Sequence, residues 1–397
     1  MSSDVSHPVI HELETAGPDR LFAEPLHVGR PNLGDRHKLL ERFGAVLDSH
    51  WLTNDGPNVR AFEAAIARCL DVQHCIAVSN ATIGLQIAIA ALELSGEVIV
   101  PSFTFAATVH ALSWQGITPA FCDVELDTHN IDPVAAARLI GPNTTGILGV
   151  HLWGNPCAID ALRALADEHR LALFFDAAHA FGCSFDGRMI GNFGRAEVFS
   201  FHATKFLSTG EGGVIATNDE ELAQKMRRLR NFGSEGDEAI GIGINGKMSE
   251  IAAVMGLTAL ESKGEFIARN QNNFLVYEEV LRDIPGVNLV SNPTVEQRNQ
   301  QYIVVEVDDS LAGMSRDDTI AALHRQNVIA KRYFSPGCHR LEAYRSLHQS
   351  QYNPLPHTER LCDRLLQLPT GTGVSREDIV KIGDYLQRLT ARARTAA

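Results

Sequence analysis

Two residues that could do covalent and acid–base chemistry lie directly after predicted strands of this sequence. Lys205 ends the segment Phe199-Ser-Phe-His-Ala-Thr-Lys205, and Asp176 ends the very apolar run Leu171-Ala-Leu-Phe-Phe-Asp176. A carboxylate at the end of a buried strand needs a partner, because burial of an unpaired charge is costly. A single lysine is usually a solvated surface residue, and a buried aspartate is often part of a structural salt bridge. Lys205 and Asp176 therefore indicate a functional site only if other chemically suitable groups of the sequence belong to the same site.

A third group is the segment Val78-Ser-Asn-Ala-Thr82, which connects a predicted strand to a helical pattern. The first backbone N–H groups of a helix and the helix dipole favour an anion there, although many helices begin with Asn, Ser or Thr only as caps. The sequence has no GxxxxGK[ST], and Gly210–Gly213 is no GxGxxG, so neither an ATP-type loop nor a dinucleotide fold is indicated. A phosphate site, a carboxylate and a lysine fit pyridoxal 5'-phosphate, which has a phosphate, a ring nitrogen and a lysine-reactive aldehyde.

Alternating strands and helices must position these groups between about residues 60 and 220. A mostly parallel sheet with helices on both faces is predicted, and such a sheet binds its ligand at the carboxyl ends of its strands. Asp176, Lys205 and the helix start near Ala81 all fall at such ends. We expect strands at 74–78, 98–100, 119–123, 147–151, 171–176, 197–201 and 214–216, and helices at 82–94 and 158–169.

The pattern changes after Asn231-Phe232-Gly233. The glycine-rich stretch 241–246 leads into a long helical pattern that Ser249 can cap. Further along we expect a strand at 301–307, a helix at 317–327 and a last helix from Ser375, with Asp378 at capping-box spacing. We therefore predict an N-terminal segment (1–30), a large domain (31–264) and a smaller C-terminal α+β domain (265–397).

Composition excludes several classes of protein. The chain has 397 residues, of which 45% are hydrophobic and 21% charged, as in ordinary soluble globular proteins. Its net charge of −13 argues against a nucleic-acid partner, whereas a local basic pocket for a small anion stays possible. The longest apolar stretch, 81–94, is interrupted by Gln86 and Glu93 and is shorter than the roughly 20 residues that span a bilayer. We therefore expect neither a nucleic-acid partner nor a membrane partner.

The seven cysteines indicate a reducing compartment. Their number is odd and none forms a CxxC pair, so a disulfide framework and a zinc ribbon are not expected, and no metal is predicted. The start MSSDVSHPVIHELE lacks the basic and apolar regions of a signal peptide. These features predict a cytoplasmic protein with cysteines in its core.

Several longer motifs carry a family resemblance. The sequence resembles the fold-type I pyridoxal-phosphate aminotransferases that act on nucleotide-linked keto sugars, over nearly the whole chain. Its His-Ala-Thr-Lys form is most similar to the 4-aminotransferases for dTDP-4-keto-6-deoxyglucose in deoxyaminosugar and antibiotic biosynthesis. The resemblance implies an aspartate-aminotransferase-like fold and a homodimer with shared active sites. The matching motifs are Gly29-Arg-Pro-Asn, Trp51-Leu-Thr, Gly56-Pro, Pro101-Ser-Phe-Thr-Phe-Ala-Ala-Thr108, His151-Leu-Trp-Gly154, Asp176-Ala-Ala-His179, Phe201-His-Ala-Thr-Lys205 and the loop 336–339.

The resemblance also assigns cofactor roles to residues of this chain. Lys205 corresponds to the Schiff-base lysine, and Asp176 to the aspartate under the pyridine nitrogen. Ala81 and Thr82 correspond to the phosphate-binding turn, and Ser200 to a hydroxyl that reaches the same phosphate. Phe105 corresponds to the aromatic ring stacked on the cofactor, with a core phenylalanine as the alternative.

Further roles fall on less specific positions. His179 stands near the phenolic oxygen of the cofactor, where most relatives carry glutamine and the most similar subgroup also has histidine. Asn245 corresponds to an asparagine given to the phosphate by the neighbouring subunit, with a turn former in a glycine-rich loop as the alternative. Lys247 stands where many relatives have arginine. Tyr333 and His339 lie in the loop that meets the nucleotide sugar; a solvated lysine and a structural histidine are the alternatives for Lys247 and His339.

The implied reaction moves the amino group of L-glutamate to the 4-keto carbon of dTDP-4-keto-6-deoxyglucose. The nearest alternative is another sugar aminotransferase, which acts at carbon 3 or gives the galacto product. A related dehydratase branch carries histidine in place of the lysine, and Lys205 argues against it. An amino-acid aminotransferase would use Arg332 to grip a carboxylate, and a cofactor-binding regulator without catalysis would need a DNA-binding module or basic arm that the sequence lacks.

Overall fold

The computed structural model describes residues 20–291, 296–351 and 353–396. The expectation about a signal peptide and most of the predicted N-terminal segment concern residues 1–19, which lie outside the described residues.

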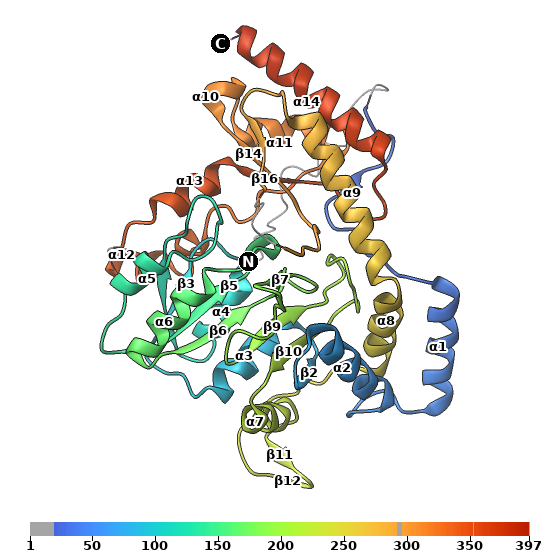
Figure 1. Ribbon diagram of the computed structural model, residues 1–397, viewed down its shortest axis with the longest axis vertical. Coiled ribbons are helices and arrows are strands. Elements are labelled where there is room, and N and C mark those ends of the chain that lie inside the picture. Colours follow the sequence, from blue (N-terminus) through green and yellow to red (C-terminus); the bar gives the residue numbers. More distant parts are fainter. Residues whose placement is uncertain (1–19, 292–295, 352, 397) are drawn as a thin grey trace, which may run out of the picture.

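A seven-stranded sheet lies in the lower half of the molecule in Figure 1, with the strand order β2-β10-β9-β6-β5-β3-β4. Strand β10 pairs antiparallel with β2 and β9, and the neighbouring strands from β9 to β4 run parallel. The prediction of a mostly parallel mixed sheet flanked by helices is confirmed. The strands are β2 (His74–Val78), β3 (Glu97–Pro101), β4 (Thr118–Cys122), β5 (Thr144–Val150), β6 (Ala172–Asp176), β9 (Glu197–Ser200) and β10 (Gly213–Thr217).

Helices bury both faces of this sheet. Successive residues of a strand point to opposite faces, so Phe174 joins one apolar cluster with Leu85 while Phe175 joins the other with Phe62. Side chains of α3, α4 and α7 fill the first cluster, and those of α2, α5, α6 and α8 fill the second. The bounds are α2 (Pro57–Leu70), α3 (Ala81–Ala91), α4 (Ala106–Ser113), α5 (Pro133–Arg138), α6 (Ile159–His169), α7 (Glu220–Arg230) and α8 (Glu250–Glu261); α1 (Arg36–Ser49) packs on α8.

The connection from β2 to α3 is short and tightly packed. Asn80 caps α3 by accepting a hydrogen bond from the N–H of Ile83 (2.9 Å). A Cβ at Gly213 would lie 2.8 Å from the nitrogen of Ala81, so glycine is what allows β10 to approach the helix start. The beginning of α3 is therefore fixed at the carboxyl edge of the sheet.

A second, antiparallel sheet of order β13-β14-β16 lies in the C-terminal part, in the upper half of Figure 1. It shares an apolar cluster with the long helices α9 and α14. The predicted capping box is confirmed, since the N–H of Asp378 donates to Ser375 Oγ (3.1 Å) and the N–H of Ser375 donates to Asp378 Oδ2 (2.9 Å). The elements are α9 (Lys263–Leu281), β13 (Val287–Leu289), β14 (Ile303–Val307), α10 (Asp309–Ala312), α11 (Arg316–Arg325), β16 (Leu365–Leu368) and α14 (Arg376–Ala396).

Two segments pack on the other part of the molecule: β1 joins the C-terminal part, and residues of the C-terminal part pack on the large sheet. Strand β1 (Leu26–His27) pairs with β15 (Val328–Ile329), and Cys338, Tyr344 and Leu355 pack into the cluster of the large sheet. The residue limits of the two domains stay a prediction. The remaining elements are the strand pairs β7 (Ser184–Phe185) with β8 (Arg188–Met189) and β11 (Ser234–Glu235) with β12 (Glu238–Ala239), and the helices α12 (Arg345–Gln351) and α13 (Pro356–Arg364).

The cysteines lie mainly in the core, as expected. Six are buried, Cys69 is partly buried, and all seven are free thiols. Among the residues that the structure describes, none of the helices has the length and apolarity needed to cross a membrane.

Candidate active site

The carboxyl ends of β3, β5, β6 and β9 and the start of α3 surround a cavity of about 600 Å³. Segments of the C-terminal part close it from the other side, including Tyr302 and Lys331. The structure brings together most of the residues that the sequence indicated. Those that line the cavity are Ala81, Thr82, Phe105, Asp176, His179, Ser200, Lys205 and Tyr333.

Asp176 is a buried carboxylate with two hydrogen-bond donors. Thr108 Oγ1 donates to its Oδ2 (2.7 Å), and the backbone N–H of Ala178 donates to its Oδ1 (3.0 Å). Thr108 lies on α4, and its hydroxyl is also 3.0 Å from that of Thr104. Burial raises the pKa of Asp176, whereas the two hydrogen bonds and the charge of Lys205 oppose this rise. The site therefore holds a fixed carboxylate that a cationic ring nitrogen could pair with.

Lys205 lies in the loop between β9 and β10, partly buried at the cavity wall. Its Nζ is 2.7 Å from the phenolic oxygen of Tyr302. Burial lowers the pKa of Lys205 to about 8, and the charge of Asp176 opposes this effect. Near physiological pH the amine of Lys205 is therefore neutral in a much larger share of molecules than that of an ordinary lysine, and the neutral form is the one that acts as a nucleophile or proton acceptor.

His179 is packed between aromatic rings and has a defined tautomer. It stacks on Trp153, with ring centres 5.6 Å apart, and on Phe334. Its Nδ1 accepts a hydrogen bond from the backbone N–H of Trp153 (3.2 Å), and burial holds the pKa of His179 well below its usual value. The neutral imidazole thus carries its proton on Nε2 and offers a hydrogen-bond donor at the cavity wall.

The part of the cavity wall at the start of α3 suits an anion. The N–H groups of Ala81 and Thr82 are at the first turn of α3, where a helix has no internal acceptor for them. The hydroxyl-bearing residue Ser200 ends β9 beside them in the cavity wall. Phe105, which directly precedes α4, is 58% exposed although the nearby Phe103 is fully buried, so Phe105 is not a core phenylalanine. Its ring can cover a flat ligand.

Three predicted residues do not line this cavity. Asn245 is exposed and forms an isolated bridge with Asn231, and Lys247 places its Nζ 4.4 Å from the ring centre of Phe232. His339 is 1% exposed, and its Nδ1 is 2.7 Å from Ser102 Oγ. Burial also lowers the pKa of His339 to about 4. The geometry of His339 therefore favours the structural alternative over direct contact with a substrate.

Arg332, which an amino-acid aminotransferase would use to bind a carboxylate, also lies outside the cavity. Its side chain is 60% exposed and faces Asp317 at 3.7 Å, outside the cavity. This position gives no support to a carboxylate grip by Arg332.

Several residues that line the cavity, or that hold residues lining it in place, were not identified from the sequence. Thr108 belongs to a matched motif, and its spacing of four residues from Thr104 near a helix start was an available signal. Tyr302, Gln301 and Lys331 reach the cavity from the C-terminal part, and no local pattern marks them. Trp153 supports His179 from a backbone with φ of 58°, which a sequence does not reveal.

These residues fit pyridoxal 5'-phosphate. The start of α3 would hold its phosphate, Asp176 its ring nitrogen, Phe105 its ring face and Lys205 its aldehyde. The cavity has the size of an ordinary cofactor or ligand site. Within the described residues, no three or more His, Cys, Asp or Glu side chains gather as metal ligands.

Comparison with known proteins agrees with this site. The chain is 33% identical over 363 residues to the dTDP-4-amino-4,6-dideoxy-D-glucose transaminase of Escherichia coli, an alignment that covers 90% of this chain and 97% of the relative. A crystal structure of DesI in the presence of its TDP-sugar product superposes with a TM-score of 0.92 at 49% identity, covering 96% of each chain. PseC of Helicobacter pylori, an aminotransferase involved in pseudaminic acid biosynthesis, superposes with a TM-score of 0.85 at 26% identity, covering 93% of this chain and all of PseC.

Fold, site and relatives together define a pyridoxal-phosphate-dependent aminotransferase of fold type I. Residues 35–387 match the DegT/DnrJ/EryC1/StrS aminotransferase family, and the chain belongs to that family.

Proposed function

We propose that this chain transfers the amino group of L-glutamate to the 4-keto carbon of dTDP-4-keto-6-deoxyglucose, giving dTDP-4-amino-4,6-dideoxyglucose. The observation that carries the proposal is the cavity with Lys205 and Asp176, in a chain 49% identical to DesI, which was crystallised with a TDP-sugar product. The E. coli relative, named for the transaminase of the same 4-amino sugar, adds support.

Pyridoxal phosphate, when bound, acts as an electron sink and carries the amino group between the two substrates. The residues of this chain bind it and move protons. Nζ of Lys205 takes the proton from the α-carbon of glutamate and later returns a proton, first as a general base and then as a general acid. Asp176 would hold the ring nitrogen in its protonated form, and the hydrogen bond from Thr108 keeps this carboxylate in place. Nε2 of His179 would supply a hydrogen-bond donor for the phenolic oxygen.

The nucleotide sugar enters on the side of Tyr333 and Lys331. Both line the cavity, and their side chains are 3.5 Å apart, from Lys331 Nζ to Tyr333 Oη. A lysine at this position gives an acidic protein a local positive charge for a diphosphate. In this proposal His339 acts indirectly, by fixing Ser102 and the loop 338–340 to the end of β3.

The active unit in this proposal is a homodimer in which Asn245 serves the neighbour's cavity. Asn245 lies on the surface in a loop with large exposed apolar side chains, including Ile242 at 96% and Phe232 at 53% exposure. A second exposed pair, Trp51 and Leu52, begins the loop before α2. Exposed apolar patches of this kind mark protein interfaces, and two-fold dimers are the commonest oligomers.

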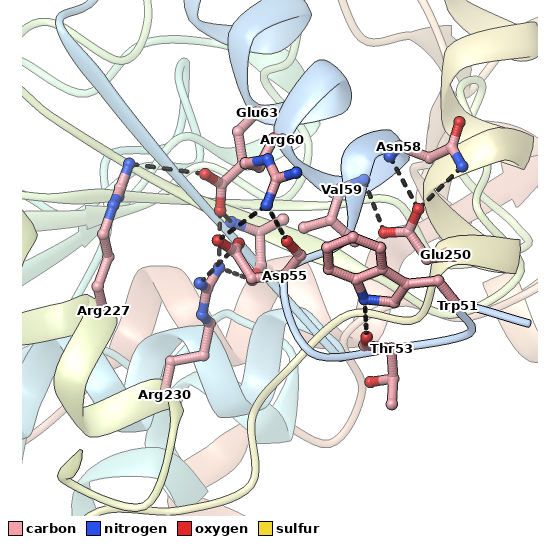
Figure 2. Close-up of polar contacts among 11 residues, drawn as sticks. Trp51, Thr53, Asp55, Asn58, Val59, Arg60, Glu63, Arg227, Arg230 and Glu250 are labelled. Carbon is pink, nitrogen blue, oxygen red and sulfur yellow. Dashed lines mark hydrogen bonds and ion pairs between the residues drawn. The ribbon is translucent and has the colours of Figure 1, made fainter. Parts of the chain in front are cut away.

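Ion pairs and hydrogen bonds hold the end of the loop before α2 and the start of that helix. Figure 2 shows Arg230 in contact with both Asp55 and Glu63. Its Nη1 is 2.7 Å from Glu63 Oε1, and its Nη2 is 3.3 Å from Asp55 Oδ1. Glu250 accepts hydrogen bonds from the backbone N–H groups of Asn58 (2.8 Å) and Val59 (3.0 Å) at the start of α2.

The same network reaches the loop of Asn245. The N–H of Gly246 donates to the carbonyl of Arg230 (2.9 Å), and Asn231 bridges to Asn245. The segment around Arg230 therefore supports both exposed loops. In this proposal a partner subunit would contact the two loops as one preformed surface.

The runner-up function is an aminotransferase for another nucleotide-linked keto sugar, with the amine placed on carbon 3 or in the galacto configuration. A regulator that binds the cofactor without catalysis is the more distant alternative. We place the reaction in the cytoplasm, which the free, mainly buried thiols support. We also place it in deoxyaminosugar biosynthesis of the antibiotic type; the likeness to transaminases of a 4-amino-4,6-dideoxy sugar supports the deoxyaminosugar part.

Product analysis separates these functions. The purified protein is incubated with pyridoxal phosphate, L-glutamate and dTDP-4-keto-6-deoxyglucose, and the products are identified by mass spectrometry and NMR. We expect an amino group on carbon 4 in the gluco configuration, with 2-oxoglutarate in equal amount. A galacto product would support one form of the runner-up. An amine on carbon 3 requires a 3-keto sugar, so a parallel incubation with the dTDP-linked 3-keto isomer tests the other form. A protein that binds cofactor but forms no amine from either sugar would support the regulator.

A further inference from the structure

The contact between Lys205 and Tyr302 joins two distant parts of the chain. Lys205 lies after β9 of the large sheet, whereas Tyr302 directly precedes β14 of the C-terminal sheet. Their Nζ and phenolic oxygen are 2.7 Å apart although the residues are 97 positions apart in sequence. Within the described part of the chain, this phenol is the hydrogen-bond partner found for the Lys205 amine.

The ring of Tyr302 is fixed independently of this hydrogen bond. It packs against His179, with ring centres 4.4 Å apart, and meets Trp153 edge to face at 5.4 Å. The preceding residue Gln301 donates from its side chain to the carbonyl of His179 (2.8 Å) and accepts from the N–H of Phe206 (3.3 Å). The phenol of Tyr302 therefore has a fixed position. The side chain of Lys205 has several rotatable bonds, and its hydrogen bond to this phenol restricts it.

The chemistry of a phenol suits an amine that changes protonation state. Burial raises the pKa of Tyr302 well above its usual value, so the hydroxyl keeps its proton. A neutral phenol can accept a hydrogen bond from an ammonium group and can donate one to a neutral amine. The same partner can thus hold Lys205 before and after it takes up a proton.

We propose that Tyr302 is the positioning residue that holds the amine of Lys205 at the cavity wall whenever that amine is not bonded to the cofactor. This inference rests on the proposed function, in which the freed Lys205 carries the proton in both half-reactions. Tyr302 would act through Lys205 and not on the substrate.

The test uses Tyr302→Phe, which keeps the ring contacts and removes only the hydroxyl. The matched control is Tyr344→Phe, because the Tyr344 hydroxyl is also 2.7 Å from a nitrogen, Nδ1 of His110, but lies away from the cavity. Incorporation of 3-fluorotyrosine at position 302 keeps a hydroxyl and serves as the conservative rescue. Thermal unfolding of each variant shows that it is folded.

The first readout needs no catalysis. Lys205 in the cofactor-free protein is acetylated with acetic anhydride across a pH series, and the extent is read by peptide mass spectrometry. An ammonium group gains more from a hydrogen bond than a neutral amine does, so loss of the phenol lowers the pKa of Lys205 further. We expect the midpoint of modification to move to lower pH in Tyr302→Phe and to stay in Tyr344→Phe. An unchanged midpoint in Tyr302→Phe would overturn the proposal.

The second readout is steady-state kinetics of the complete enzyme. We expect Tyr302→Phe to lower kcat about 10- to 100-fold with KM nearly constant, since a misplaced proton carrier affects the chemical step. The α-deuterium isotope effect with labelled glutamate should rise, and the fluorotyrosine protein should recover most of kcat. A change confined to KM, or no recovery with fluorotyrosine, would contradict the positioning role. Failure of the wild-type protein to transaminate would refute the proposed function instead, and the acetylation result would still decide on the Tyr302–Lys205 contact.

Discussion

The backbone N–H of Trp153 donates to Nδ1 of His179 over 3.2 Å, and this bond fixes the position of the imidazole proton. The neutral ring carries its proton on Nε2. Burial also holds the pKa of His179 well below its ordinary value, so the ring becomes charged only at acidic pH.

The first prediction is that His179 does not titrate between pH 6 and pH 8. Nitrogen-15 NMR of the labelled imidazole should show the Nε2-protonated neutral form throughout this range. Because the folded-state pKa is lowered, the stabilising contribution of the neutral ring is present above the unfolded pKa of about 6.5 and is lost as the pH falls. A titration of His179 within the range, or a proton on Nδ1, would refute this description of the site.

The second prediction concerns the support of Asp176. Thr108→Val removes the hydroxyl that donates to Asp176 Oδ2 and keeps nearly the same shape. A hydrogen bond to a charged group is worth about 1.5–3 kcal/mol, so the rate at which glutamate reacts with the bound cofactor should fall about 10- to 100-fold. Thr104→Val is the matched control, because Thr104 contacts Thr108 but not Asp176, and its effect should be much smaller. Equal rates in wild type and Thr108→Val would contradict the assigned role.

The third prediction is a larger loss in Asp176→Asn. The amide keeps the shape of the side chain but removes the charge that favours a protonated ring nitrogen. Loss of such an electrostatic partner should slow the glutamate half-reaction about 10²–10⁴-fold, as single-turnover absorbance would show. A near-normal half-reaction in this variant would mean that Asp176 is only a structural carboxylate.

The fourth prediction follows from the pKa of Lys205, which burial lowers to about 8. Attachment of the cofactor requires the neutral amine, and this form dominates above that pH. The rate of covalent attachment to the cofactor-free protein should therefore rise up to about pH 8 and level off above it, as followed by absorbance. A rate that keeps rising toward pH 10 would indicate an ordinary solvated lysine.

The fifth prediction tests the shared dimer. Lys205→Ala inactivates its own site, and Asn245→Asp places a negative charge beside the neighbour's phosphate. In a mixed dimer one site combines both changes and the other is intact. Equal mixing after dissociation should recover about a quarter of wild-type activity, since about half of the dimers are mixed and each has one intact site. If mixed dimers form without any recovery, Asn245 acts within its own chain or not at all.

The sequence predicted the elements and groups that depend on local pattern. The strand ends at Asp176 and Ser200 and the helix start at Ala81 lie within one or two residues of their expected positions. Hydrophobic alternation and capping residues determine such features, and both can be read from neighbouring residues.

The contacts across the cavity could not be predicted in this way. The expected strand 301–307 begins only at Ile303, because Gln301 and Tyr302 turn to His179 and Lys205. Their partners are about a hundred residues distant and meet them only when the two parts of the chain pack together. Likewise, the burial that separates His339 from the cavity results from the packing of the loop 338–340 against Ser102.

The most direct test of the site is to locate the cofactor on the chain. The protein is loaded with pyridoxal phosphate, reduced with borohydride, digested and analysed by peptide mass spectrometry, with Lys205→Ala as the control. We expect one labelled peptide, with the cofactor mass on Lys205, and no covalent label in Lys205→Ala. Label on any other lysine of the wild-type protein, or label that persists in Lys205→Ala, would contradict it.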